Sequence, residues 1–355
     1  MLKALSKYEQ IYDYLMSEMA KRDIGELLPC ETDLAAKLHV NRMTVSKVMS
    51  ALKSQGFIAR KQGRGSTIIK KVQEEVKGLI SVLPGTETNI KDSYFSTLMQ
   101  VVSKECIDKG YVNTFTGCLT QGKDASFDYN TLNSLASSGQ YVGAVILDSK
   151  TRHLKEWKAN FKYNDFPVVW TAMPSELAQG MSSVDIDNRA AAVRLVEHLY
   201  AQGHRRIGFI STEIDSAHRR ERYTGYREAL ERLNLRLDES LVIIQDYEQA
   251  ETGYKAAEKL ARLNDLPDAL FVAQHPVLQG IKKFEEEHKT PFLSILPVAT
   301  FDYEFTGEFE NVAVSVRQPF EQMGKEAFEL VLKIKDGTLA TPASKVLKAE
   351  IITKE

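Results

Sequence analysis

The chain of 355 residues lacks several features that would assign it to a common class of protein. Its three cysteines are an odd number without a Cys-x-x-Cys pair, which argues against a disulfide framework and against a zinc module. The start of the chain lacks the apolar core of a signal peptide, and no stretch approaches the ~18 apolar residues of a membrane span. We therefore expect a cytoplasmic protein with reduced cysteines and no membrane partner.

Sequence motifs of catalysis are missing as well. The chain contains no Gly-x-x-x-x-Gly-Lys-Ser/Thr phosphate loop, no His-Glu-x-x-His and no Gly-x-Ser-x-Gly. The Gly-x-Gly at 63–65 does not connect a strand to a helix, and the seven histidines show no metal-ligand spacing. We therefore expect no enzymatic activity, no cofactor and no metal.

The net charge is also low, at −2, but it is unevenly distributed. Residues 1–71 contain 13 Lys/Arg against 7 Asp/Glu, whereas the remaining 284 contain 33 against 41. Between 34 and 71 nine basic residues occur without one acidic residue. This asymmetry predicts a small basic module, suited to nucleic acid, joined to a larger acidic one. The alternative is a solvated basic surface without a partner.

The beginning of the chain has the apolar spacing of a helix. The stripe consists of Tyr8, Ile11, Tyr12, Leu15 and Met19. Gly25 and Pro29 then interrupt the pattern, and a short second helix is expected around 34–38.

A third helix and two short strands follow. Asn41 is a favourable N-cap for this helix, and Gly56 closes it. Two β-prone runs at 57–60 and 66–69 flank a Gly-rich turn at 62–65. The order of these elements predicts a winged helix-turn-helix, an α+β domain that binds DNA.

The third helix of such a domain fits the major groove of DNA. Arg42, in its first turn, can donate two hydrogen bonds to guanine, while Thr44 and Ser46 suit phosphate contacts. The wing tip can approach the DNA backbone or the minor groove. The candidate DNA-binding residues are Thr32, Asn41, Arg42, Met43, Thr44, Ser46, Lys47, Gln62, Gly63 and Arg64.

Several motifs of this region resemble, in order, those of the GntR-type DNA-binding domain. The matching segments are 28–35, 40–45, 55–58 and 63–67. The resemblance implies double-stranded DNA as the partner. Asn41 stands where the family usually has Ser, a mild change that keeps Arg42. Ser46 stands where a second basic residue is common, so the resemblance predicts DNA binding but not which base sequence is read.

The rest of the chain alternates strand-like and helix-like segments. Hydrophobic residues are 43% and charged residues 26% of the chain, as in folded proteins. The length of 355 residues suggests two or three domains. Strict alternation predicts an α/β architecture with parallel sheets, two lobes and a ligand outside the carboxyl ends of the strands. We therefore expect a DNA-binding domain at 1–70, a linker at 71–77 and a two-lobed ligand-sensing and dimerisation domain at 78–355.

The larger domain resembles the periplasmic-binding-protein-like effector domain of the LacI/GalR family. The segments that carry the resemblance are 184–188, 203–210, 222–226, 267–273, 300–302 and 316–319. No LacI-type helix-turn-helix or hinge helix precedes them. The order of domains resembles that of bacterial arabinose repressors.

This second resemblance implies which residues contact an effector. They are Tyr94, Phe95, Asp187, Arg222, His275 and Asp302. Gln274-His275 stands where the family typically has Asn-Asp, so the effector differs from an ordinary neutral sugar or the site is altered.

Each effector assignment has a structural alternative. The two aromatic residues are explained equally by a position in the core. Arg222 is also explained by an ion pair with Asp215 or Glu221, His275 by a helix start, and Asp302 by a turn.

Together these patterns predict a ligand-responsive transcription repressor. We expect a homodimer that binds a roughly palindromic operator and is released by a small, sugar-related molecule. A regulator that needs a corepressor, or a solute-binding receptor without DNA function, is the alternative.

Overall fold

The computed structural model describes residues 6–61, 65–70, 76–84, 93–116, 129–147, 156–157, 159–173, 181–213, 216–245, 249–291 and 294–354. The chain forms two compact units, Met1–Val76 and Lys77–Glu355, which we call the head and the body. The head is a winged helix-turn-helix, and the body is an α/β structure with two sheets. The predicted fold class is therefore confirmed.

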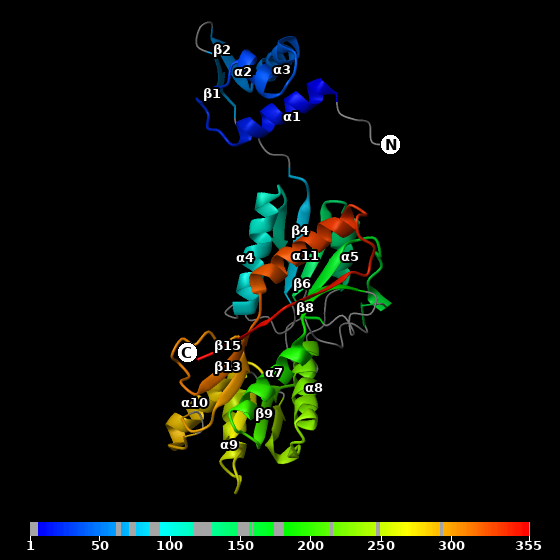
Figure 1. The fold of residues 1–355 in the computed structure, drawn as a ribbon. Coiled ribbons are helices and arrows are strands. Elements are labelled where there is room, and N and C mark those ends of the chain that lie inside the picture. The colour runs from blue at the N-terminus through cyan, green and yellow to red at the C-terminus, as the bar shows by residue number, and fades with distance from the viewer. Residues whose placement is uncertain are drawn as a thin grey trace. The chain divides into compact units, whose positions relative to one another are not determined.

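The head contains three helices and one small antiparallel sheet (Figure 1). Its helices are α1 Lys7–Ala20, α2 Glu31–Lys37 and α3 Arg42–Ser54, and its strands are β1 Leu27–Leu28, β2 Ile58–Lys61 and β3 Gly65–Ile68. The strand order is β1-β3-β2. The strand β1 was not predicted, because its two residues are too few to show the alternation of apolar and polar side chains that marks a strand.

Local sequence signals explain where the helices of the head begin and end. Ser6 and Glu9 form a reciprocal capping box at the start of α1. Gly56, at φ 76°, ends α3, and the amide of Phe57 donates to the carbonyl of Leu52 over 2.9 Å. The apolar faces of the helices meet in one core. Its members include Ile11, Leu15, Met19, Leu34, Val45, Val48, Met49 and Leu52.

The body has two lobes, each built on one six-stranded sheet. The first sheet has the order β14-β8-β7-β6-β4-β5, and the second has the order β10-β9-β11-β12-β13-β15. The first lobe consists of β4 Leu79–Pro84, α4 Ser93–Asp108, β5 Val112–Phe115, α5 Tyr129–Ser137, β6 Tyr141–Leu147, β7 Val168–Thr171, β8 Ser182–Ile186, α11 Phe320–Lys335 and β14 Ser344–Leu347. The second consists of α7 Asn188–Ala201, β9 Ile207–Thr212, α8 Ala217–Arg232, β10 Val242–Gln245, α9 Gln249–Leu260, β11 Ala269–Val272, α10 Pro276–His288, β12 Val298–Phe301, β13 Val312–Arg317 and β15 Glu350–Thr353.

All described strand pairs of the body are parallel except one. The exception is β15, which runs antiparallel to β13 at the edge of the second sheet. The alternation pattern predicted parallel strands and gave no signal for β14 or β15. Both are short, and β14 is mostly exposed, so neither has a continuous apolar run.

Helices cover both faces of the second sheet. Neighbouring residues of one strand point to opposite faces, so Phe209 packs with α7 and α8 whereas Ile210 packs with α9 and α10. The ring of Phe209 lies 5.0 Å from that of Tyr226 on α8. This arrangement leaves the strand ends, rather than the faces of the sheet, available for a site.

The chain passes between the lobes three times. The crossovers lie between β8 and α7, between β13 and α11, and between β14 and β15. Figure 1 shows α4, α5 and α11 beside the first sheet and α7 to α10 beside the second. The first crossover is the shortest, because only Asp187 separates β8 from α7.

Gly225 allows α7 and α8 to pack closely. A Cβ at this position would lie 2.3 Å from the carbonyl oxygen of Arg189 and 2.8 Å from the Cβ of Ala192. Because a larger residue would push the helices apart, Gly225 fixes the approach of α8, and with it the position of Arg222 one turn earlier.

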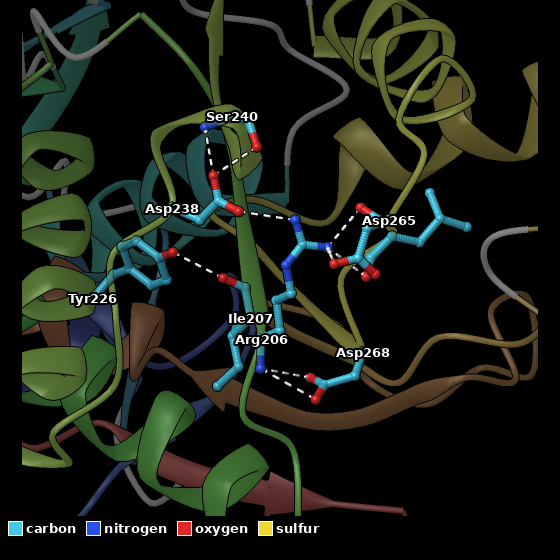
Figure 2. Close-up of polar contacts among 8 residues, drawn as sticks. Arg206, Ile207, Tyr226, Asp238, Ser240, Asp265 and Asp268 are labelled. Carbon is cyan, nitrogen blue, oxygen red and sulfur yellow. Dashed lines mark hydrogen bonds and ion pairs between the residues drawn. The ribbon is translucent and has the colours of Figure 1, made fainter.

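The segment around Arg206 forms a polar network at the amino end of β9 (Figure 2). Arg206 Nη2 lies 2.8 Å from Asp238 Oδ2, its Nη1 donates to the carbonyl of Leu266 over 2.8 Å, and its amide donates to Asp268 over 3.1 Å. Hydrogen bonds from Ser240 and Arg206 lower the pKa of Asp238 to about 2. This network anchors the sheet at the end opposite to the carboxyl ends of its strands.

No helix within the described ranges is both long and apolar enough to cross a membrane. The same part of the chain contains no group of three or more His, Cys, Asp or Glu side chains that could hold a metal ion.

Candidate functional site

The first turn of α3 displays the central residues of the predicted DNA-binding surface. Asn41 caps the helix, since its Oδ1 accepts a hydrogen bond from the amide of Met43 over 2.8 Å. Arg42 and Met43 are both exposed, and the Met43 side chain is 70% accessible. Lys47 is exposed and Ser46 is half-buried one turn later. This face of α3 therefore presents two basic groups at the end that reaches bases in a major groove.

One carboxylate, that of Glu31, pairs with two arginines of the head. Glu31, the first residue of α2, lies with Oε2 3.7 Å from Nε of Arg42, and its other oxygen pairs with Arg60 of β2. One acidic side chain thus joins α2, the start of α3 and the wing. Sequence reasoning missed this role, because Glu31 lies just outside the stretch without acids.

Two further predictions for the head remain predictions. Thr32 is exposed at the start of α2, where its hydroxyl lies 3.6 Å from Sγ of Cys30. Thr44 is half-buried, and its amide donates to the carbonyl of Asn41. The expected wing-tip contacts of Gln62, Gly63 and Arg64 fall outside the described residues.

In the body, polar side chains gather at the carboxyl ends of strands from both sheets. We call this group the interlobe cluster: Asp185, Asn188, Arg222, Gln274 and Asp302. Each lies within two residues of the end of β8, β11 or β12, or in the helices α7 and α8 packed beside them. Ligands of open α/β sheets bind at such edges.

Arg222 is the centre of the interlobe cluster. It is only 3% exposed, its Nε donates to Asn188 Oδ1 over 2.9 Å, and its Nη1 donates to the carbonyl of Ala273 over 2.7 Å. Burial lowers the pKa of Arg222 to about 10, while the nearby carboxylates of Asp302 and Asp185 act in the opposite direction. The structure shows no ion pair between Arg222 and Glu221, and Asp215 lies outside the described residues.

Asp185 was not predicted, yet it lies in the same cluster. Its Oδ1 accepts hydrogen bonds from the amide of Ile186, over 2.8 Å, and from Asn188 Nδ2, over 3.3 Å. Burial raises the pKa of Asp185 to about 7. A signal was present in the sequence, because a lone carboxylate ends an otherwise uncharged strand.

Four buried polar atoms in this region have no hydrogen-bond partner among the described residues. They are Asp185 Oδ2, Ser211 Oγ, Gln274 Oε1 and Thr300 Oγ1. They lie at or near the carboxyl ends of β8, β9, β11 and β12, respectively. Buried polar atoms are nearly always paired, so an unpaired set at one edge indicates a place where a ligand or water completes the bonding.

The other members of the cluster also form hydrogen bonds with described residues. Gln274 Nε2 donates to Thr212 Oγ1 over 3.0 Å. Asp302 Oδ2 accepts a hydrogen bond from Gln318 Nε2 over 2.7 Å, and Asp302 itself has a φ of 61°. Asp302 therefore has the backbone of a turn residue and also belongs to the interlobe cluster, so the two interpretations of the sequence do not exclude each other.

The remaining effector candidates make other contacts among the described residues. Phe95 is 4% exposed and belongs to the core, as the structural alternative expects, and its ring packs edge-on against that of the exposed Phe115. Tyr94 lies in the first lobe with its hydroxyl 2.6 Å from Thr171 Oγ1. Asp187 is exposed and caps α7 through the amide of Ala190, over 2.8 Å.

His275 also lies beside the cluster rather than within it. It is half-buried at the start of α10, directly before Pro276, and its ring centre lies 6.4 Å from that of Tyr303. At Gln274-His275 the chain thus has an amide in the cluster and a histidine beside it, where the family typically has Asn-Asp.

Comparisons with known proteins match each unit separately. Residues 7–68 match the family model described as bacterial regulatory proteins, gntR family, and residues 196–355 match the periplasmic binding protein-like domain. The HTH-type transcriptional repressor CytR of Escherichia coli (strain K12) is 25% identical over 318 residues, which cover 89% of this chain and 88% of CytR.

Solved structures share the fold. A transcriptional regulator CelR–cellobiose complex has a TM-score of 0.65 at 21% identity and covers 92% of this chain and 99% of its own. The lac repressor dimer bound to operator and the anti-inducer ONPF has a TM-score of 0.62 at 15% identity, with 78% and 92% covered. These relatives are transcription regulators.

Proposed function

We propose that this chain, in which a gntR-type DNA-binding domain precedes a periplasmic-binding-protein-like domain, represses transcription and is released from operator DNA by a small molecule. The observation that carries the proposal is the presence of two different candidate binding sites on one chain. An exposed basic helix start in the head fits DNA, and a buried, incompletely bonded polar cluster in the body fits a ligand.

The head would bind DNA through α3. Arg42 would donate to a base edge in the major groove, and Lys47 would contact phosphate. Because the lac repressor relative is a dimer on its operator, we infer that this chain also acts as a homodimer on a roughly palindromic site.

The body would sense the effector at the interlobe cluster. The CelR relative is in complex with cellobiose, which supports a sugar-related effector here. Three crossovers connect the lobes, so a ligand that contacts both lobes would favour one arrangement of them over another. Coupling of this kind changes DNA affinity by typically ~1–3 kcal/mol.

The test uses the full chain and a duplex selected from a random library. We expect anisotropy to show tight binding that weakens steeply with salt, and Arg42→Ala to reduce the affinity at least about tenfold. Lys53→Ala is the matched control, since it removes one exposed charge from the far end of the same helix.

Selection that yields no enriched duplex, or equal affinities for Arg42→Ala and wild type, would contradict the proposal. Adding an effector to the protein–DNA complex then shows whether the effector weakens or strengthens DNA binding. Release identifies an inducer, whereas tighter binding identifies a corepressor and corrects that part of the proposal.

A further inference from the structure

We propose that Asp185 binds the effector directly and that the group it recognises, together with Arg222, is a vicinal diol. The inference deepens the proposed function, and it depends on that function only in placing the ligand at the interlobe cluster. Free sugars and the ribose of nucleosides both carry the required group.

The first argument is the incomplete bonding of Asp185. The residue is 1% exposed at the end of β8, and its two donors among the described residues, Ile186 and Asn188, reach the same oxygen, Oδ1. The second oxygen, Oδ2, has no partner among the described residues. A buried carboxylate oxygen without a donor is costly, so a ligand hydroxyl that donates to it would gain more than an ordinary hydrogen bond.

The second argument is the donor beside it. Arg222 uses Nε and Nη1 for Asn188 and Ala273, which leaves Nη2 without a hydrogen bond to any residue that the structure describes. The amide of Asn188 joins the two groups, because it donates to Asp185 and accepts from Arg222. The amide of Asn188 therefore holds an acceptor, Asp185 of β8, on one side and a donor, Arg222 of α8, on the other.

This pairing selects the chemistry of the ligand. A hydroxyl both donates and accepts, so two adjacent hydroxyls can serve Asp185 and Arg222 at once. A carboxylate or phosphate at the same place would also bind Arg222, but it would bring a negative charge against Asp185 and has no proton to donate. The site thus favours a neutral diol over an anion at this position.

The charges around Asp185 make binding depend on pH. Burial raises the pKa of Asp185 to about 7, Arg222 on α8 acts to lower it, and Asp187 in the crossover acts to raise it. The neighbouring strands contribute uncharged residues, Val346 of β14 opposite Asp185 and Thr171 at the end of β7. Asp302 acts on Arg222 rather than on Asp185.

A hydroxyl that donates to Asp185 requires the ionised carboxylate. Binding should therefore release a proton, and affinity should fall as pH falls below about 7, the pKa of Asp185. Because only the ionised fraction is competent, affinity at pH 6 is expected to be about tenfold weaker than at pH 8.

The experiment uses the full chain without DNA and four probes: D-ribose, D-xylose, D-galactose and adenosine. Thermal shift at pH 8 identifies the probe that binds, and calorimetry at pH 6 and pH 8 gives its affinities. A response to a monosaccharide identifies a free sugar, and a response to adenosine alone identifies a nucleoside. Among the monodeoxy counterparts of the binding probe, each of which lacks one hydroxyl, those that lose a hydroxyl of the bound diol should bind at least about tenfold more weakly.

Two variants separate Asp185 from other carboxylates. Asp185→Asn keeps the shape of the side chain, and it should weaken binding at pH 8 at least about tenfold and abolish the difference between pH 6 and pH 8. Asp336→Asn removes an exposed carboxylate after α11 and should keep the wild-type pattern. If Asp185→Asn fails to fold, calorimetry of the wild type in two buffers of different ionisation enthalpy should show release of about half a proton at pH 7.

Three results would overturn the inference: no binding of any probe at pH 8, equal affinity at pH 6 and pH 8, or full affinity of every monodeoxy counterpart. Failure of the proposed function is seen separately, as loss of DNA binding. A chain that binds DNA but no diol keeps the function and loses this inference. If the chain binds a diol through Asp185 but no DNA, this inference stands and the proposed function is contradicted.

Discussion

The guanidinium carbon of Arg222 lies 3.6 Å from the ring centre of Phe301, while Nε of the same side chain donates to Asn188. Stacking on one side and hydrogen bonding along the edge hold the planar group in one orientation. A side chain fixed before binding loses little freedom when a ligand arrives, so this contact favours affinity as well as placement.

Arg222→Lys should therefore impair ligand binding even though the charge is kept. A lysine ammonium cannot stack in the same way on Phe301 or donate to Asn188 and Ala273 in a fixed fork. We expect the affinity for the binding probe, measured by calorimetry, to fall at least about tenfold. Arg220→Lys, an exposed neighbour on α8, is the control. Unchanged affinity in Arg222→Lys would remove Arg222 from the site.

Asp185→Asn should stabilise the unliganded protein, and more so at high pH. The folded pKa of about 7 lies above the ordinary value of 3.8, so the contribution of this group to stability is present at low pH and is lost as pH rises through about 7. The gain in the free energy of unfolding should be larger at pH 8 than at pH 5, by about 2–3 kcal/mol. Chemical denaturation of both proteins at both pH values measures it. An equal gain at the two pH values would show that Asp185 does not titrate in this range.

Gly225→Ala should destabilise the body and weaken ligand binding together. The new Cβ would meet the backbone of Arg189 at 2.3 Å, so α7 and α8 must separate, and the contact between Asn188 and Arg222 spans these two helices. Overpacking of this kind costs about 1–3 kcal/mol. Thermal denaturation measures the loss, with the exposed neighbour Thr224→Ala as control. A variant as stable as the wild type would mean that the helices adjust freely.

Glu31→Gln should reduce the ability of the head to distinguish its operator from other DNA. Without the carboxylate, Arg42 and Arg60 lose an ionised partner and become available to any phosphate. Binding to random duplex should tighten, and the ratio between selected and random duplex should narrow, as measured by anisotropy. Asp13→Asn, an exposed charge change on α1, should leave the ratio unchanged. The stability of the head should fall by no more than about 1 kcal/mol.

Much of the architecture could be predicted because its signals are local. The cap at Asn41 and the glycine at 56 define α3 within two residues of its observed bounds, Arg42–Ser54. Buried parallel strands such as Tyr141–Leu147 read as continuous apolar runs. The elements β5, α5, β8 and β13 were not predicted either, and the strands β1, β14 and β15 were missed because each is short and is formed by pairing with distant strands rather than by its own pattern.

The interlobe cluster could be predicted only in part from the sequence. Arg222 and Asp302 were named through resemblance, and the structure brings them to one edge, but it places Gln274 there and His275 beside it. Asp185 could not be identified in that way, because its importance depends on which oxygen finds a partner after folding. Phe95 illustrates the opposite case, since an aromatic residue at a suitable position in the sequence is directed into the core.

The three crossovers mean that neither lobe is a continuous piece of chain. The first lobe takes α11 and β14 from beyond the second lobe, and β15 then returns to the second sheet. One junction in a gene therefore cannot exchange one lobe for that of a relative, and all three must be kept together. For the same reason the two lobes should melt in a single cooperative transition, because unfolding one of them releases the chain segments that complete the other.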